Sequence, residues 1–474
     1  MTEGPKPYPS YKPSGVPWLG ELPRHWDLRR GKTLFRCIDI RSKDGEEELL
    51  TVSSERGVVP RKSAAVTMFK AQSYVGYKLC WPGDLVINSL WAWARGLGVS
   101  RYHGIVSSAY GVYRLRPGYE SYSAFIHELV RSTPFHWELR VRSKGVWISR
   151  LQITDDAFLG APIPLPLPDE RSAIVRYLAY MDRRIRKYIR AKLKLIGLLN
   201  EQKQAIIHKA VTRGLDPSVK LRPSGVPWLG DVPEHWGGVR RVKQATRILR
   251  GKFTHRPRND PSLYDGQYPF IQTGDVARAA KTITSYRQTL NERGLAVSSM
   301  FPSGTLVMTI AANIGDVAVL DFEACFPDSV VGFIPRSGVE RDYLYYTFRT
   351  MKPELLREAP VNTQGNLNVE RIGSMGVVLP PPDEQVGIVR YIEESILGLH
   401  GAVDRAHREI DLLREYRTRL VADVVTGKLD VREAAANLPE ETEEAELQDE
   451  IDASVGDTED SVGEAEEDDG EAGS

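Results

Sequence analysis

The chain has 474 residues, 41% of them hydrophobic and 27% charged, so it is long enough for two or more domains. No run of about 18 apolar residues occurs, and the start MTEGPKPYPS has no apolar segment after a basic one, so neither a transmembrane helix nor a signal peptide is expected. The three cysteines are scattered, which argues against a disulfide framework and favours a cytoplasmic protein.

The net charge of zero conceals an uneven distribution. Residues 437–474 contain 17 acidic residues and no lysine or arginine, so the rest of the chain holds 63 basic and 46 acidic residues. A basic body predicts a polyanionic partner. The acidic segment lacks aromatic residues and is predicted to be disordered. It would be either a solubilising tail or a decoy that competes with nucleic acid for the basic surface.

In chain order, the first motif is PSGVPWLGELPRHW at 13–26, which returns as PSGVPWLGDVPEHW at 223–236 with eleven of fourteen residues identical. We call it the opening motif. His25 and His235 recur in it without a nearby nucleophile, so packing or hydrogen bonding is expected rather than catalysis. Because a segment that reads a target should differ between two copies, the opening motif is predicted to hold the start of each body against a shared scaffold.

The two bodies that follow the opening motifs are predicted to be mixed α/β with many short strands. GDLVINSLWAWARGLGVS (83–100) and SGTLVMTIAANIGDVAVLD (303–321) occupy equivalent places, and each fits strand, glycine-containing turn and strand. The two body sequences otherwise look unrelated. The repeated ends therefore serve a common scaffold, and the bodies do something that must differ.

A second repeat, LPLPDERSAIVRYL at 165–178 and LPPPDEQVGIVRYI at 379–392, predicts the start of a long helix in each copy. Proline followed by two acidic residues is typical of a helix start, where acids complement the dipole, so Asp169–Glu170 and Asp383–Glu384 are interpreted as structural rather than catalytic.

Apolar residues then recur at spacings of three and four over roughly 40 residues, or about 60 Å, which favours a coiled coil between the two copies. Lys192, Ser395 and Glu409 interrupt this pattern. The predicted seam residues are Ile174, Leu178, Met181, Ile185, Tyr188, Leu195, Leu199 and Ile206 in the first helix, and Ile388, Ile392, Leu399, Ala402, Ala406, Leu413, Tyr416 and Leu420 in the second.

Connectivity predicts that the helices pack antiparallel with one body at each end, as a pseudo-twofold dumbbell. The predicted fold class is α/β, of mixed α+β type, in two tandem copies separated by two long antiparallel coiled-coil helices. The predicted boundaries are 1–168 for the first body, 169–213 for the first helix, 214–382 for the second body, 383–428 for the second helix and 429–474 for the exit segment and acidic tail.

Motifs for catalysis are missing from the sequence. The GKT at 31–33 would need a glycine five positions before Gly31 to form a phosphate loop, and Trp26 stands there. No GxGxxG, HExxH or Asn-Pro-Pro-Tyr-type motif is present. We therefore expect no catalytic, cofactor-binding or metal site in this chain.

The remaining polar residues point to nucleic acid, because Arg and Lys neutralise phosphates or pair with guanine, and Asn and Gln can pair with adenine. Trp91 and Trp93 are as compatible with core packing as with contact. The candidate DNA-binding residues are Arg41, Lys43, Arg61, Lys62, Trp91, Trp93, Arg95 and Arg101 in the first body, and Arg250, Lys252, Arg256, Arg258, Gln364, Asn366 and Asn368 in the second.

The doubled PxWLGxxPxHW and the doubled Pro-Asp-Glu motif, clearest as LPPPDEQVGIV at 379–389, resemble those of type I restriction-modification specificity subunits. The resemblance covers nearly all of the chain except the acidic tail. The first copy departs at Arg171, where the second has the more usual Gln385, and only a local surface difference is expected from this.

The resemblance implies that each body is a target recognition domain that reads one half of a bipartite DNA site. The long helices would hold these domains apart and help to bind modification subunits. Two methyltransferase subunits and restriction subunits would be the partners. S-adenosylmethionine, ATP and magnesium are then expected on those partners and not in this chain, which would neither methylate nor cut.

Two different bodies related by a pseudo-dyad predict an asymmetric DNA target, split by an unread spacer whose length the helices set. Two alternatives remain open from the sequence. The chain could be a stand-alone DNA-binding protein without methyltransferase partners, or a nuclease or methyltransferase complete in one chain.

Overall fold

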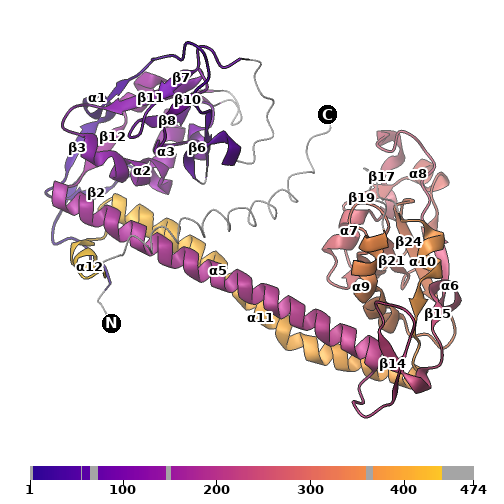
Figure 1. The fold of residues 1–474 in the computed structure, drawn as a ribbon. Helices are drawn as coiled ribbons and strands as arrows, with labels where there is room; N and C mark the ends of the chain where they lie inside the picture. Colours follow the sequence, from indigo (N-terminus) through magenta and orange to yellow (C-terminus); the bar gives the residue numbers. More distant parts are fainter. Residues whose placement is uncertain (1–3, 55, 64–72, 146–150, 359–366, 440–474) are drawn as a thin grey trace. The chain divides into compact units, whose positions relative to one another are not determined.

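The computed structural model describes residues 4–54, 56–63, 73–145, 151–358 and 367–439. The chain forms two compact units (Figure 1). Unit 1 combines residues 1–193 with 407–474, and unit 2 is the continuous segment 194–406. Of the acidic segment 437–474, which is predicted to be disordered, all but residues 437–439 lie outside the described ranges. Among the described residues, no helix has both the length and the apolarity needed to cross a bilayer.

The described part of the first body is built on a four-stranded antiparallel sheet with the order β4-β11-β8-β9. Two-stranded ribbons β1-β2, β3-β12, β5-β6 and β7-β10 surround it. The strands are β1 (Tyr11–Pro13), β2 (Glu21–Pro23), β3 (Asp27–Arg30), β4 (Phe35–Cys37), β5 (Leu50–Ser53), β6 (Gly57–Pro60), β7 (Lys78–Cys80), β8 (Leu85–Asn88), β9 (Leu97–Val99), β10 (Gly104–Val106), β11 (Tyr110–Leu115) and β12 (Pro162–Leu165).

Short helices complete the first body. Helix α2 (Ser123–Arg131) turns Phe125, Ile126 and Leu129 into the core, which its spacing of three and four residues dictates. The others are α1 (Gly31–Leu34), α3 (Thr133–Arg142), α4 (Asp155–Leu159) and the 3-10 turns η1 (Arg61–Ser63), η2 (Ala92–Ala94) and η3 (Glu120–Tyr122).

The described part of the second body has a five-stranded sheet, β16-β24-β21-β22-β18, and a four-stranded one, β19-β17-β23-β20. The ribbons β13-β14 and β15-β25 flank them. The elements are β13 (Leu221–Pro223), β14 (Asp231–Pro233), η5 (Glu234–Trp236), β15 (Arg240–Arg241), α6 (Val242–Ala245), β16 (Thr246–Arg250), η6 (Pro261–Leu263), β17 (Tyr264–Phe270), α7 (Thr273–Arg278), β18 (Thr282–Ile283), β19 (Gln288–Leu290), α8 (Glu292–Ala296), β20 (Met300–Phe301), β21 (Leu306–Thr309), β22 (Val317–Leu320), β23 (Ala324–Cys325), β24 (Val330–Pro335), α9 (Arg341–Glu358), α10 (Val369–Ser374) and β25 (Gly376–Val377).

Each body contains its own sheet, and the two sheets have the same strand order although the body sequences look unrelated. The order β4-β11-β8-β9 in the first corresponds strand by strand to β16-β24-β21-β22 in the second, and all of these neighbours are antiparallel. Strands β8 and β21 are almost wholly buried, so both read as short apolar runs rather than as alternating patterns. The predicted mixed α/β class in two tandem copies is confirmed.

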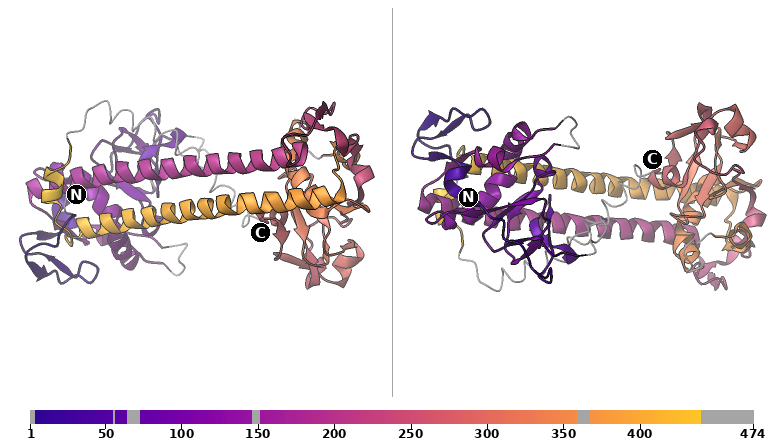
Figure 2. Two further views of the ribbon diagram at one scale, coloured as in Figure 1. Left: turned by 90° about the horizontal axis from the view of Figure 1, so that it is seen from below. Right: turned by 90° about the horizontal axis from the view of Figure 1, so that it is seen from above.

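The long helices are α5 (Pro168–Arg213) and α11 (Pro382–Val425), and each contributes to both units. In unit 1, Asp182 pairs with Arg417, and Lys192 Nζ lies 2.5 Å from Glu409 Oε2. Residue numbers rise along α5 as they fall along α11, so the helices run antiparallel there (Figure 2), as predicted. The polar interruptions Lys192 and Glu409 thus compensate each other.

In unit 2, the remaining halves of α5 and α11 also contact each other. Lys203 Nζ on α5 lies 3.1 Å from His400 Nε2 on α11.

The apolar seam differs in part from the predicted one. Tyr188, Leu195 and Tyr416 are exposed, so their assignment to the seam is wrong. Ile185, Ile196 and Ile207 are buried at steps of eleven residues, which track a straight helix more closely than a strict heptad does. Of the other predicted seam residues, Ile174, Leu178, Ile185, Ile388, Ile392, Ala406 and Leu420 are buried, and Met181, Leu199, Ile206, Leu399, Ala402 and Leu413 are half-buried. The seam also contains Ile396 and Ile410, which the sequence pattern missed.

The difference between Arg171 and Gln385 is internal, and the expected surface change is wrong. The Arg171 guanidinium is buried and stacks 4.2 Å from the Tyr122 ring centroid. The fully buried Gln385 accepts from the Glu340 backbone N–H at 2.7 Å and donates to the carbonyl oxygens of Gly338 and Pro380. Each body therefore contacts its long helix through different chemistry at this position.

Unit 1 is closed by contacts between the two ends of the described chain. The Asp430 backbone N–H donates to the Lys6 carbonyl at 2.7 Å, and the Tyr11 hydroxyl donates to the Lys428 carbonyl at 3.0 Å. In unit 2 the corresponding path from helix end to opening motif is one continuous stretch of chain.

Gly427, just past the end of α11, holds this closure in place. Its φ is +77°, and a β-carbon would lie 2.5 Å from Pro23 Cδ in the first opening motif. Gly427→Ala is therefore expected to lower the free energy of unfolding of unit 1 by about 2 to 3 kcal/mol in denaturant titrations. Gly20→Ala is the control, because Gly20 has φ +62° with nothing near its missing β-carbon. Equal losses in the two variants would contradict a steric role for Gly427.

His127 makes unit 1 sensitive to acid. Its Nδ1 accepts from the Val99 backbone N–H at 3.2 Å, so the ring is neutral at that nitrogen. Burial, and then Arg131 and Arg101, lower the pKa of His127 from 6.5 to about 4. Because the unfolded chain takes up this proton first, stability is complete above about pH 6.5 and is lost progressively toward pH 4. Thermal unfolding of His127→Gln should be less pH-dependent in that window, and an unchanged slope would count against this role.

Candidate nucleic-acid interface

The repeated motifs bind one another in each unit. In unit 1, Glu170 Oε2, in the first turn of α5, lies 2.9 Å from His25 Nε2 and accepts from Trp26 Nε1 at 2.8 Å. The predicted attachment of the opening motif to the helical scaffold is confirmed there. Neither motif alone links the His-Trp pair to the acidic pair. Their joint duplication was the signal that could have linked them.

Unit 2 repeats the same three-residue contact. Glu384 Oε2 lies 2.9 Å from His235 Nε2, and Glu384 Oε1 accepts from Trp236 Nε1 at 2.9 Å. We call the two clusters the His-Trp-Glu clasps. A conserved attachment in both units leaves the remaining surface of each body free to differ.

The basic candidates of the first body fall into separate groups. Arg41 forms a strand bridge with Lys78, whose Nζ donates to the Tyr110 carbonyl at 2.7 Å. The charge of Arg61, the first residue of η1, also acts on the Tyr110 hydroxyl. Arg41 is held by Asp39 at 3.0 Å. The structure thus brings Arg41 and Arg61 to one part of the body, and Lys43 and Lys62 are exposed next to them in sequence.

The tryptophan-rich turn forms a second group. The Trp91 and Trp93 rings stack at 6.4 Å between centroids, and Trp91 is exposed. Trp93 Nε1 donates to the Leu90 carbonyl at 2.8 Å, so Trp93 also stabilises the turn. Arg95 donates to Thr133 Oγ1 on α3 at 2.9 Å. Arg101 is exposed elsewhere, within electrostatic range of His127 on α2.

The basic candidates of the second body gather around the loop between β23 and β24. Arg256 lies 3.6 Å from the Asp328 carboxylate, and Arg258 pairs with the same group. The Lys252 backbone N–H donates to the Phe326 carbonyl at 3.0 Å, and its side chain is exposed, as is that of Arg250. The single carboxylate of Asp328 therefore pairs with two arginines, which leaves a net positive charge at this loop.

The amide candidates of the second body receive little support. Asn368 caps α10, because its Oδ1 accepts from the Glu370 backbone N–H at 3.0 Å. Gln364 and Asn366 lie outside the described residues.

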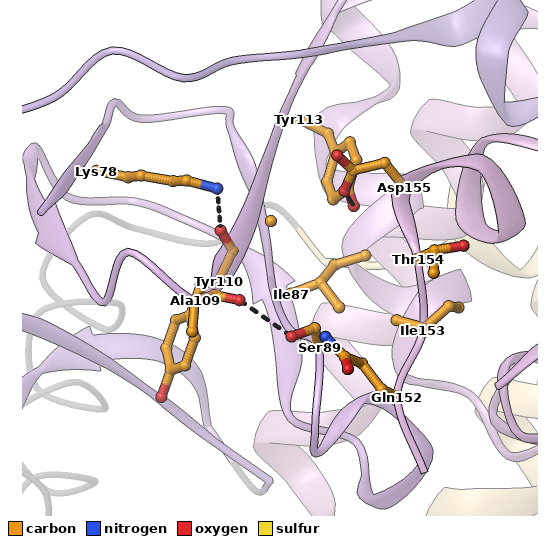
Figure 3. Close-up of a pocket in the computed structure, with 11 residues that line it drawn as sticks. Lys78, Ile87, Ser89, Ala109, Tyr110, Tyr113, Gln152, Ile153, Thr154 and Asp155 are labelled. Atoms are coloured by element: carbon orange, nitrogen blue, oxygen red, sulfur yellow. Dashed lines mark hydrogen bonds between the residues drawn. The ribbon is translucent and has the colours of Figure 1, made fainter. Parts of the chain in front are cut away.

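A cavity of about 240 Å³ lies in the first body between β8, β11 and the segment before α4 (Figure 3). Two of its polar groups are bonded within the protein: the Tyr113 hydroxyl donates to Asp155 Oδ1 at 2.7 Å, and Ser89 Oγ donates to the Ala109 carbonyl at 3.0 Å. Burial raises the pKa of the nearby Cys37 thiol, which is the opposite of activation. Within the described ranges, no three or more His, Cys, Asp or Glu side chains are arranged to hold a metal ion.

Comparison with known proteins finds a family match within the second body. Residues 239–399 match the type I restriction modification DNA specificity domain. The chain is also 26% identical over 176 residues to the type I restriction enzyme MjaIX specificity subunit of Methanocaldococcus jannaschii. The second body is thus similar to a type I DNA specificity domain. That alignment covers 35% of this chain and 40% of its relative, so it spans about two fifths of the relative's length.

Solved structures show a likeness in fold over most of this chain. A chain from work on complex assembly and conformational transition of the type I R-M system covers 85% of it, with a TM-score of 0.62 and 18% identity. The HsdS subunit of Thermoanaerobacter tengcongensis covers 86%, with a TM-score of 0.44 and 18% identity. The first of these supports the assignment of two mixed α/β bodies joined by long helices.

Proposed function

We propose that this chain is the DNA-recognition subunit of a type I restriction-modification complex, in which each body reads one half of a bipartite, asymmetric site. The observation that carries the proposal is that the two bodies have the same scaffold but different basic surfaces. Both bodies share a sheet order and a His-Trp-Glu clasp. Arg41 and Arg61 gather near Tyr110 in the first, whereas Arg256 and Arg258 gather at Asp328 in the second.

Different surfaces on equivalent scaffolds favour different half-sites. Lysine and arginine contacts with phosphates would position each body, and a few contacts with base edges would provide specificity. The long helices α5 and α11 would set the spacing between the half-sites, as dimer geometry does for other DNA-binding proteins.

Selection from a random duplex library by the complete complex tests this recognition. Arg41→Gln with Lys43→Gln in the first body should relax the sequence preference in one half-site only. The matched pair Arg250→Gln with Lys252→Gln should affect only the other half-site. Variants that relax both halves equally would overturn the assignment of one half-site to each body.

The two helices also carry equivalent exposed apolar residues. Leu198 on α5 is 53% exposed and Leu412 on α11 is 63% exposed, and they stand 214 positions apart, as the duplicated Pro-Asp-Glu motifs do. Exposed apolar groups on a helix surface are typical of an interaction site. Two identical partners need the same chemistry at repeat-related positions, so each leucine is proposed to contact one of two modification subunits.

Leu198→Glu is expected to remove one modification subunit from the purified complex, and Leu198→Glu with Leu412→Glu should remove both. A buried carboxylate at such a contact costs several kcal/mol, enough to lower affinity by at least about 100-fold. Native mass measurement of the complex gives the stoichiometry. Leu397→Glu is the control, because Leu397 is 71% exposed but its counterpart in the first copy is Arg183. Full occupancy in the double variant would contradict docking at these leucines.

Methyl transfer and cleavage are proposed to belong to the partner subunits, together with S-adenosylmethionine, ATP and magnesium. Incubation of the purified chain with duplex DNA and these three compounds should give neither product. Either activity from this chain alone would overturn its assignment as a non-catalytic subunit.

A further inference from the structure

Helix α5 carries an excess of positive charge that the proposed function does not use. Residues 171–200 contain nine basic residues, and Asp182 is the only acidic one. Arg176, Arg183, Lys187 and Arg190 are spaced by seven, four and three residues, so they share one helix face. We call these four residues the α5 basic stripe. The buried seam residues Ile174, Leu178 and Ile185 lie on the opposite face.

The basic stripe is not part of the duplicated scaffold. The residues that occupy its positions in α11 are Arg390, Leu397, Gly401 and Asp404. The equivalent segment, 385–414, has five acidic and four basic residues. Seam residues, clasp residues and Leu198 with Leu412 recur in both copies. A charged face in one copy alone therefore indicates a task that is performed once in the molecule.

The C-terminal part of the chain passes the beginning of the stripe. After α12 (Arg432–Ala436), the Arg176 guanidinium donates to the Leu438 carbonyl at 3.3 Å and approaches the Pro439 carbonyl at 3.5 Å. Residues 440–474 come next in sequence and contain 17 acidic residues and no basic one. An acidic segment thus starts beside one end of a basic helix face in the same unit.

The lengths are compatible with contact along the whole stripe. From Arg176 to Arg190 the helix rises by about 21 Å at 1.5 Å per residue. Thirty-five residues can extend to more than about 100 Å. Attachment at Pro439 gives the acidic residues an effective concentration on the order of millimolar at the stripe, so weak individual ion pairs add up.

We propose that residues 440–474 bind the α5 basic stripe within the same chain and shield it from other polyanions. Electrostatic complementarity supplies the attraction, and salt weakens it. Duplex DNA is the competing occupant, because phosphates would also suit a row of arginine and lysine side chains. The anchoring contacts of Arg176 with Leu438 and Pro439 favour the acidic segment. The proposal does not depend on which DNA sequence the bodies read.

Zero-length carbodiimide cross-linking of the full chain tests the contact, because it joins a lysine amine only to a carboxylate that touches it. Lys187 is the lysine of the stripe, and exposed Lys43, Lys62 and Lys252 serve as references. At low salt, mass spectrometry should find Lys187 joined to residues 440–474 at least about five times as often as each reference lysine. At about 0.5 M salt this excess should fall, because salt screens the attraction between the charges. Even distribution over the four lysines would overturn the proposal.

A second measurement separates shielding from direct DNA binding. In the full chain, the 17 acidic residues of 440–474 are replaced by their amides, and nonspecific duplex affinity is measured at low salt. The nonspecific affinity for duplex DNA should rise about tenfold when the stripe is intact. It should not rise when Arg183→Gln, Lys187→Gln and Arg190→Gln are also present. Arg390→Gln on α11, the counterpart of Arg176, is the control and should leave the rise unchanged. An equal rise with and without the stripe, or no rise at all, would overturn the proposal.

Discussion

Glu170→Ala is expected to reduce the free energy of unfolding of unit 1 by about 2 to 4 kcal/mol. The Glu170 side chain is 2% exposed, and its Oε2 accepts from the Trp26 indole at 2.8 Å and contacts His25 Nε2 at 2.9 Å. Trp26 is fully buried, so its N–H would lose its partner without gaining water. Denaturant titration followed by tryptophan fluorescence measures the loss.

Glu384→Ala is the matched variant, because Glu384 makes the same two contacts in unit 2 but is 29% exposed. Water can replace part of the lost hydrogen bonding there, so a smaller cost of about 1 kcal/mol is expected. A larger loss in Glu384→Ala than in Glu170→Ala would contradict the role assigned to burial. No loss in either variant would show that the clasps do not hold the bodies to their helices.

Shortening both long helices is expected to lower affinity for the natural DNA site by at least about tenfold without changing either half-sequence. Deletion of residues 191–197 from α5 together with 404–410 from α11 removes seven residues from each partner of the antiparallel pairing around Lys192 and Glu409. Leu198 and Leu412 stay in place. The loss is about 10.5 Å of helix, close to three base pairs, whereas the seam shifts in phase by only about 20°.

The control for helix shortening is Lys192→Gln with Glu409→Gln, which removes the ion pair and keeps the length. Library selection with the shortened chain should recover unchanged half-sites with a spacer about three base pairs shorter, or no sites. New bases within a half-site, or full affinity for the natural spacing, would show that the helices do not set the spacer.

Repeats made most of the architecture predictable from the sequence. The doubled opening motif and the doubled Pro-Asp-Glu motif marked two copies, and apolar spacing identified α5 and α11. The exact seam was less accessible, because spacing alone does not distinguish a heptad from an eleven-residue repeat. Leu195 was therefore assigned to the seam in place of Ile196, one position and about 100° away.

Contacts between distant residues could not be read from the sequence. Nothing local indicates that Arg256 and Arg258 pair with Asp328, about 70 positions away, or that Glu170 binds His25. Asn368 lay in an amide-rich segment that suggested base contact, but its side chain caps α10. The candidate DNA-binding residues stay predictions, because charge and exposure locate a surface without identifying which side chains reach a base.

Mapping methylated bases across the genome of cells that carry the complete system tests the central claim most directly. Two unlike bodies on one duplicated scaffold predict a single asymmetric motif, made of two half-sites separated by an unread spacer of constant length. A palindromic motif, or one continuous run of specified bases, would contradict recognition of separate half-sites by the two bodies.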